Sequence, residues 1–175
     1  MNHPPYRRQN LRLPTYDYTT PGSYFVTVCI QRRACVLSEI VDGEVDLSDV
    51  GRMVQTHLRL AVDRYPGVEL DTFVLMPNHL HAVFNIGWAT GENQEGISLS
   101  RVMNWFKSAT TNEYIRRVKA ESWPRFPGTF WQDNFHEHIV RDQGDLDRIR
   151  EYIVGNPGKW ELDSEYFPIC RGFSQ

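Results

Sequence analysis

Two histidines separated by one residue are the part of this sequence best suited to chemistry. His79-Leu80-His81 lies in a run of β-forming residues, and alternate side chains of a strand point to the same face of a sheet. His79 and His81 would therefore lie a few ångströms apart, with Leu80 on the other face. Two imidazoles placed in this way can chelate one divalent cation. The alternative, from this pattern alone, is an exposed or hydrogen-bonded pair that binds no metal.

A tyrosine and an amide near the end of the chain share one face of a predicted helix. Tyr152 and Asn156 are four residues apart, which places them on neighbouring turns of the same face. Ile149 and Ile153 give that helix an apolar stripe. Such a helix could present a phenol nucleophile beside the two histidines. The alternatives are a tyrosine at the edge of the core and an asparagine that ends the helix before Pro157.

A second His-x-His pattern, His136 and His138 around Glu137, follows a Trp-Gln segment. One interpretation is a supplementary metal ligand or a proton-transfer group near the site. The other, which we favour, is a hydrogen-bonded pair that fixes the preceding turn. If this second pair held the metal instead, Tyr152 would have no partner.

The elements that must position these residues follow from apolar periodicity and from the turn residues between them. The pattern predicts strands over 23–32, 68–76 and 79–86, helices over 47–64, 98–118 and 145–156, and a short strand pair from 130–131 and 138–140. Pro77-Asn78 separates two of the strands, which indicates an antiparallel hairpin. This order favours an α+β fold in which helices pack on one face of one antiparallel sheet.

Charge is unevenly distributed along the 175 residues, whose net charge is −3. Residues 1–33 carry five Arg against one Asp, and residues 101–130 carry six Lys or Arg against two Glu. These two stretches fit a localised phosphate-binding surface, or else two solvated faces. No apolar run approaches the ~18 residues that span a membrane, and no apolar stretch follows the arginines near the N-terminus. We therefore expect a single-domain cytoplasmic protein, associated with the nucleoid.

Three segments together resemble a known family. The segments MPNHLHAVF, WQDNFHEHIVR and REYIVGNPGKW are similar, in order and spacing, to the single-tyrosine HUH transposases. Within them the resemblance is to the branch associated with repetitive extragenic palindromes (REP), related to IS200-type elements. It implies an RRM-like or ferredoxin-like antiparallel sheet with helices. The resemblance covers a transposase domain over 21–160. The polar, proline-containing residues 1–20 would form a basic arm, and residues 161–175 a C-terminal tail.

The resemblance assigns roles to the candidate residues. His79 and His81 would bind Mg²⁺ or Mn²⁺, and Tyr152 would be the nucleophile. Asn156 would be a third metal ligand, at a position where IS200-type relatives have glutamine. The implied activity is metal-dependent cleavage and strand transfer of single-stranded DNA near hairpins or palindromic repeats, through a 5′-phosphotyrosine. Such proteins act as monomers or as homodimers.

DNA contacts are expected from the two basic stretches. The candidates are Arg7, Arg8 and Arg12 in the arm, and Arg101, Lys107, Arg116 and Arg117 in the second helix. Possible stacking surfaces are Trp105, Trp123 and Trp131, with a core role favoured for Trp131.

Two other functions are compatible with the same pattern. A non-catalytic nucleic-acid-binding module with an RRM-like fold would need neither a metal nor Tyr152. A metallohydrolase that attacks with water would form no covalent protein–DNA adduct.

Overall fold

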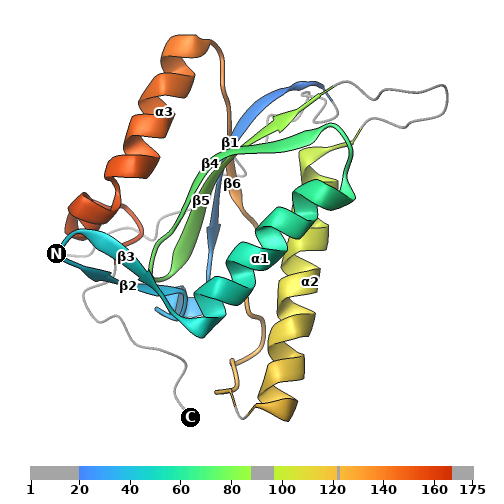
Figure 1. Ribbon diagram of the computed structural model, residues 1–175, viewed down its shortest axis with the longest axis vertical. Coiled ribbons are helices and arrows are strands. Elements are labelled where there is room, and N and C mark those ends of the chain that lie inside the picture. Colours follow the sequence, from blue (N-terminus) through green and yellow to red (C-terminus); the bar gives the residue numbers. More distant parts are fainter. Residues whose placement is uncertain (1–19, 88–96, 122, 167–175) are drawn as a thin grey trace, which may run out of the picture.

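The structure is a computed structural model that describes residues 20–87, 97–121 and 123–166. At its centre is a four-stranded antiparallel sheet with the strand order β4-β5-β1-β6 (Figure 1). The two inner strands are β1 (Gly22–Cys29) and β5 (His79–Ile86), and the two edge strands are β4 (Val68–Leu75) and β6 (His136–Ile139). The histidine pair of the sequence thus lies on an inner strand.

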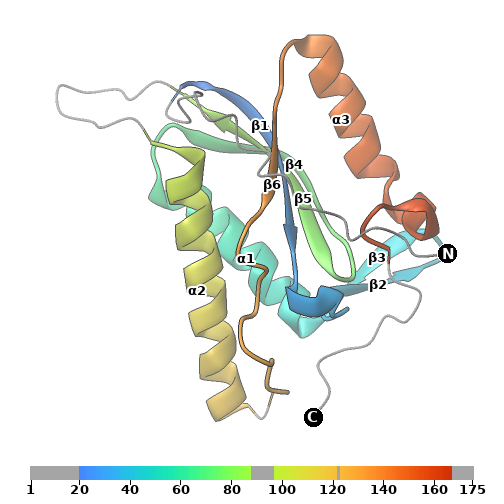
Figure 2. The same ribbon diagram turned by 180° about the vertical axis from the view of Figure 1, so that it is seen from behind.

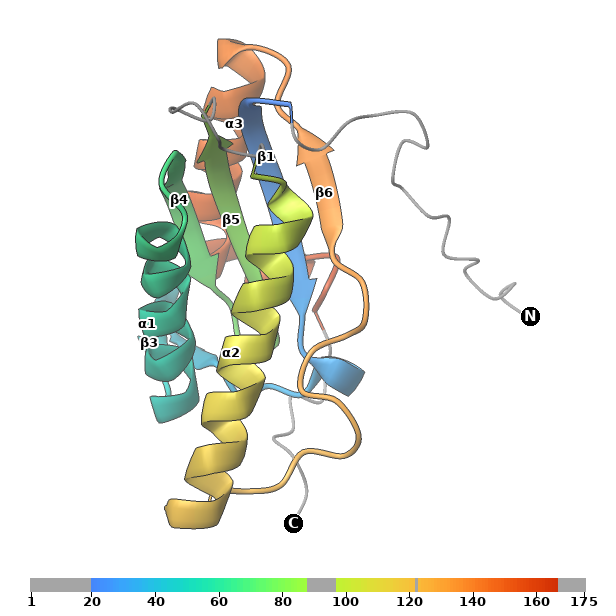
Figure 3. The same cartoon turned by 90° about the vertical axis from the view of Figure 1, so that its right-hand side faces the viewer.

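Three helices flank this sheet on two sides. The long helices α1 (Asp49–Arg64) and α2 (Leu99–Ala120) cover one face, whereas α3 (Gln143–Gly155) lies across the other (Figures 2 and 3). The predicted α+β class is confirmed. The expected packing on one face holds for α1 and α2, and the tyrosine helix has the opposite face to itself.

The core lies between the sheet and the two long helices. Alternate residues of the inner strands are completely buried there: Tyr24, Val26 and Val28 of β1, with Leu80, Ala82 and Phe84 of β5. They meet the apolar stripes of α1 and α2, which include Val54, Leu58, Val102 and Phe106. Each large apolar side chain removed from water in this way contributes about 1.5–3 kcal/mol. One face of β5 is therefore fixed by packing, which leaves its other face for His79 and His81.

Side-chain caps begin the three helices. Ser48, Ser98 and Asp142 each accept a hydrogen bond from the backbone N–H three residues ahead, and such a cap is typically worth about 1 kcal/mol. The cap at Asp142 starts α3 at Gln143, slightly earlier than its apolar pattern predicted.

One local prediction differs from the structure. Segments 130–131 and 138–140 do not pair with each other: Trp131 bridges to Ile30, and β6 pairs with β1. The physical reason is that β1, paired with β5 on one side, offers its other edge to both segments in turn. The polar region around Asp42-Gly43 forms a hairpin of β2 (Ser38–Val41) and β3 (Glu44–Leu47), with positive φ at both turn residues.

Short 3₁₀ turns complete the described chain, η1 (Gln31–Arg33) after β1 and η2 (Pro157–Leu162) after α3. In the described part of the chain, no helix has the length and apolar character needed to cross a membrane.

Candidate active site

The histidines of β5 meet at the face of the sheet that α3 crosses. Opposite them on β1 lie Cys29, which pairs with His79, and Thr27, which pairs with His81. The two Nε2 atoms are 2.9 Å apart, and both side chains are almost fully buried. Strand alternation therefore brings the imidazoles together as the sequence predicted.

Each imidazole is held by its other nitrogen. His79 Nδ1 lies 2.8 Å from Asn78 Oδ1, and His81 Nδ1 lies 2.8 Å from Thr27 Oγ1. The Asn78 amide donates in turn to the backbone carbonyl of Glu165 at 3.0 Å. Oxygen partners of this kind orient histidine ligands in metal sites and fix their tautomer. The Nε2 atom of each ring is left to face a cation.

Burial, and to a smaller extent the neighbouring His81, lowers the pKa of His79 to about 3. A buried imidazole avoids a charge that water no longer stabilises. His79 is consequently neutral at physiological pH, which is the form that binds a metal.

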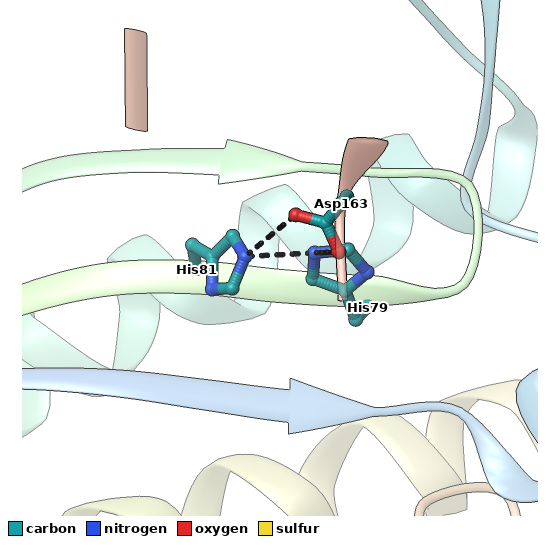
Figure 4. A group of neighbouring side chains, drawn as sticks. All are labelled: His79, His81 and Asp163. Atoms are coloured by element: carbon teal, nitrogen blue, oxygen red, sulfur yellow. Dashed lines mark hydrogen bonds and ion pairs between the residues drawn. The ribbon is translucent and has the colours of Figure 1, made fainter. Parts of the chain in front are cut away.

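A carboxylate that the sequence did not single out completes the group. Asp163 follows η2 and lies over both rings (Figure 4), with Oδ1 3.9 Å from His79 Nε2 and Oδ2 3.7 Å from His81 Nε2. Burial alone would raise the pKa of Asp163, but hydrogen bonds from His81 and Asn156 outweigh it and hold that pKa well below its usual range. One ligand atom from each of the three residues fits within 4.8 Å, a spacing suited to one metal ion.

Tyr152 reaches this group from α3. Its hydroxyl lies 3.2 Å from His81 Nε2 and donates to Asp163 Oδ2 at 2.9 Å. Its ring packs edge-on against Phe25 of β1. Burial and the charge of Asp163 raise the pKa of the phenol above its ordinary value. The hydroxyl therefore stays protonated at neutral pH and needs a base in order to act as a nucleophile.

Asn156, one helical turn beyond Tyr152, is also at the site. Its amide nitrogen donates to Asp163 Oδ2 at 2.6 Å. Its Oδ1 atom is buried and has no hydrogen-bond partner among the described residues. A buried polar atom left unpaired costs about 1–3 kcal/mol, and an amide oxygen is a good ligand for a hard divalent cation. The ligand role of Asn156 stays a prediction, because Asp163 offers a second candidate.

A small cavity gives access to the tyrosine from outside. It encloses about 120 Å³ beside Tyr152 and Asn156, and Gly155, Lys159 and Asp163 form part of its wall. Tyr152 itself is 43% exposed although its hydroxyl is engaged. Tyr152 is thus at the boundary between the buried histidines and solvent.

Comparison with known proteins identifies the family of this chain. The family described as "Transposase IS200 like" matches residues 23–156, a span that contains both histidines, Tyr152 and Asn156. The chain belongs to this family. An uncharacterised Haemophilus influenzae protein is 34% identical to this transposase over 169 residues, covering 92% of this chain and 94% of that protein.

Two further relatives carry more specific descriptions. A second Haemophilus influenzae protein, described as a candidate REP-associated tyrosine transposase, is 25% identical over 143 residues, covering 82% of this chain and 74% of its own length. The solved structure of a REP-associated tyrosine transposase bound to a REP hairpin superposes with a TM-score of 0.58. It is 21% identical and covers 85% of this chain and 73% of that chain, a likeness that shows the fold.

The tyrosine helix of this IS200-like transposase is tied to both edges of the sheet. On β4, Asp71 accepts two hydrogen bonds from the Arg150 guanidinium, at 2.8 and 2.6 Å. On β6, His138 Nε2 lies 2.8 Å from Asp145 Oδ2. Only Ile153 of α3 is buried. Polar contacts with both edge strands therefore help to hold α3, and with it Tyr152, over the histidines.

The second histidine pair lies apart from the group of His79, His81 and Asp163. His138 is engaged with α3, not with the Trp-Gln turn that it was expected to fix. His136 pairs with Thr27 through the strand backbone. Its side chain is exposed and has no hydrogen-bond partner in the described part of the chain.

The transposase presents the predicted DNA-binding residues in different settings. Arg7, Arg8 and Arg12 lie outside the described residues. The α2 residues Arg101, Lys107, Arg116 and Arg117 belong to the helix on the opposite side of the sheet from the histidines (Figure 3). The Lys107 ammonium donates to two backbone carbonyls, of Gln132 and Asp133, whereas Arg116 and Arg117 pair with Glu113. Arg101 is exposed and forms no ion pair with any described residue.

The three tryptophans considered as stacking surfaces lie in the core or pack against it. Trp131 is buried, and its indole N–H donates to Thr110 Oγ1 at 2.8 Å, which confirms the expected core role. Trp105 contacts the ring of Tyr65, and Trp123 contacts the ring of Tyr114.

Proposed function

We propose that this transposase is a metal-dependent endonuclease and strand transferase for single-stranded DNA, with Tyr152 as its nucleophile. The observation that carries the proposal is the meeting of three side chains from two separate parts of the chain, β5 and α3. The Tyr152 hydroxyl lies 3.2 Å from His81 Nε2, which itself lies 2.9 Å from His79 Nε2. A phenol beside two convergent imidazoles suits phosphodiester attack next to a cation.

His79 and His81 would hold Mg²⁺ or Mn²⁺ together with Asp163 or Asn156. The donor set fits such an ion, because both Nε2 atoms face one point and the Asn156 amide oxygen lacks another partner among the described residues. Two imidazoles favour Mn²⁺ over Mg²⁺ in affinity. A divalent cation at this point would polarise a phosphoryl oxygen and neutralise the charge that develops on it.

The residues of the chain supply the nucleophile and a proton acceptor. The Asp163 carboxylate accepts the hydrogen bond of the Tyr152 hydroxyl at 2.9 Å, so it can take that proton as the phenol oxygen attacks phosphorus. The phosphorus–O3′ bond then breaks, and the leaving oxygen is protonated to a free 3′-OH. The products are a 5′-phosphotyrosine and a 3′-hydroxyl end. Since the covalent link conserves the bond energy, a second 3′-OH can attack it and rejoin DNA.

Hairpin DNA is the proposed substrate. The solved relative of the same fold is bound to a REP hairpin. The second Haemophilus influenzae relative is also described as a candidate REP-associated tyrosine transposase. The proposal for this chain is therefore single-stranded DNA beside hairpins or palindromic repeats. A monomer and a homodimer are both compatible with this activity.

Cleavage of end-labelled hairpin DNA in the presence of Mn²⁺ tests the proposal. The oligonucleotides come from repeats that flank the gene, and denaturing gels separate free DNA from a covalent protein–DNA band. Tyr152→Phe should abolish the adduct and retain DNA binding, because the variant loses only the hydroxyl and keeps the ring contact with Phe25. Tyr166→Phe, at a tyrosine that packs on Trp160, is the matched control and should form adduct normally.

The other outcomes identify the competing functions. Adduct formation by Tyr152→Phe at the wild-type rate would overturn the proposal. Binding that ignores EDTA, without an adduct on any hairpin, would favour a non-catalytic nucleic-acid-binding module. Cleavage that needs a metal and leaves no adduct would indicate attack by water.

A further inference from the structure

The tyrosine helix covers the sheet face that carries the histidines unevenly. Among the strands, α3 packs chiefly against β4 (Figure 3). Over β1 and β6 the same face bears Phe25, which is half-buried, and His136, which is exposed. We call Phe25 and His136 the β1–β6 strip.

The strand register connects this strip to the histidine pair. His81 is opposite Thr27, and Thr27 is opposite His136, so the three residues form one row across the sheet. Two strand spacings separate His136 from His81, or about 10 Å between their backbones. Phe25 lies in the next row, and its ring centroid is 5.3 Å from that of His81 and 6.1 Å from that of Tyr152. The strip therefore begins at the nucleophile and ends at the edge of the sheet.

The side chains of β6 differ in their availability. His138 is two residues from His136 on the same face, and its Nε2 atom is engaged by Asp145. His136 has no partner within the described residues, and an imidazole carries at least one N–H donor in either charge state. Of these two histidines, His136 is the one free to meet a ligand. It is the diagonal neighbour of Phe25, whose direct partner on β6 is His138. An exposed imidazole near an aromatic ring suits a nucleotide, whose base can stack and whose phosphate can accept a hydrogen bond.

We propose that the β1–β6 strip binds the nucleotide adjacent to the scissile phosphate, with Phe25 stacking on its base and His136 donating to its phosphate. The proposal rests on the function proposed above, and it names a route by which the strand enters, over β6 and towards Tyr152. On β4, the opposite edge, the Arg150–Asp71 pair and α3 occupy the corresponding surface. On β6, α3 is held at His138 by Asp145, and His136 stays exposed. A strand that reaches Tyr152 over β6 passes both residues of the strip.

A scan of neutral phosphates tests the His136 contact. Single methylphosphonates are placed along the unpaired extension of a hairpin oligonucleotide, and affinity is measured by fluorescence anisotropy with Tyr152→Phe protein, which cannot cut. One position near the cleavage site should weaken binding about tenfold, as expected for a hydrogen bond to a charged group. In Tyr152→Phe/His136→Ala, natural DNA should bind about tenfold more weakly, and the methylphosphonate at that position should have no additional effect. Tyr152→Phe/His57→Ala, at a histidine of α1 away from this face of the sheet, is the matched control and should keep the full methylphosphonate effect.

A parallel experiment tests the stacking contact. An abasic site at the same nucleotide should weaken binding by at least about fivefold, the lower range for one base on one aromatic ring. Phe25→Leu, in the Tyr152→Phe background, keeps an apolar side chain and loses the ring. It should bind natural DNA as weakly as the parent protein binds abasic DNA, and it should not distinguish the two DNAs.

The failure of this proposal is separable from failure of the catalytic one. Two results would overturn the proposed role of the strip even if Tyr152 forms an adduct. One is an equal methylphosphonate profile for the parent and the His136→Ala variant, and the other is an abasic effect that persists in Phe25→Leu. Absence of an adduct with wild-type protein bears on the nucleophile alone, because the scan measures binding.

Discussion

The two His-x-His pairs of this transposase lie on the same face of one sheet and have opposite surroundings. His79 and His81 lie on an inner strand, beneath Tyr152 and Asp163, and are almost fully buried with their Nε2 atoms 2.9 Å apart. His136 and His138 lie on the edge strand β6, and both are exposed. One pair is covered by the C-terminal part of the chain, and the other faces solvent.

The difference shows that spacing alone does not make a metal site. In both pairs the strand aligns the side chains. Only in His79 and His81, however, does each Nδ1 atom have an oxygen partner while a carboxylate lies over both rings. These neighbours come from β1, from the turn before β5 and from the segment after α3. Convergence of several chain segments, and not the motif, distinguishes the candidate ligands from the substrate contact proposed for His136.

Loss of either buried histidine should have the largest effect. His79→Ala and His81→Ala should each reduce adduct formation by at least about 100-fold, because each removes a ligand of the cation and not only a supporting contact. Mn²⁺ titration calorimetry should show the corresponding loss of affinity. His138→Ala, with an equally large truncation on the same face, should bind Mn²⁺ like the wild type. A similar loss in His138→Ala would erase the distinction between the two pairs.

The third ligand can be identified by comparing its two candidates. Asp163→Asn should weaken Mn²⁺ binding by at least about tenfold, since it removes a charged oxygen donor from the group. Asn156→Ala should have the smaller effect. Calorimetry with both variants decides the order, and a larger loss in Asn156→Ala would favour the amide oxygen.

The contact behind His81 should have a graded effect. Thr27→Val keeps the shape of the side chain and removes the hydroxyl that lies 2.8 Å from His81 Nδ1. We expect Mn²⁺ affinity to fall about tenfold, as for other partners of metal-binding histidines. Thr27→Ser should restore most of that affinity. An equal loss in both variants would indicate a packing effect in place of the hydrogen bond.

The attachment of α3 to β4 should depend on pH. Hydrogen bonds from Arg150 lower the pKa of Asp71 below its ordinary value of 3.8. Because the folded-state pKa is the lower one, the stabilisation is complete above the ordinary pKa and is lost as pH falls through the folded-state value. Asp71→Asn should therefore lower the free energy of unfolding by about 1 kcal/mol at neutral pH. Urea unfolding should show this difference shrinking in acid, and a constant difference would contradict the assignment.

Much of the site was predictable because strands and helices impose fixed spacings. Alternation on β5 placed His79 and His81 together, and the helical turn placed Tyr152 beside Asn156. Asp163 was not predictable in this way. It follows Pro157 and Gly158 in a segment without periodicity, which was assigned to the tail, and only the path of η2 brings it over the histidines.

The side of the sheet on which a helix packs was also beyond the sequence. In the sequence, the basic residues of α2 form a set that could bind DNA. In the structure, their helix packs with α1 on the core face of the sheet, away from the histidines (Figure 3). Apolar periodicity shows that a helix has a buried side without showing which face of the sheet receives it. The pairing of β6 had the same ambiguity, since its partner was another strand far away in the sequence.

The attachment of α3 has a consequence for how the molecule opens. Its single buried side chain, Ile153, contrasts with the completely buried rows of β1 and β5. Elements with few apolar contacts detach in local fluctuations that require far less free energy than global unfolding. In native-state hydrogen exchange, amides of α3 should therefore exchange well before those of β1 and β5. The proposed nucleophile, Tyr152, would then belong to a cooperative unit separate from the core. The protein could lose the proposed reactive geometry transiently while it remains folded.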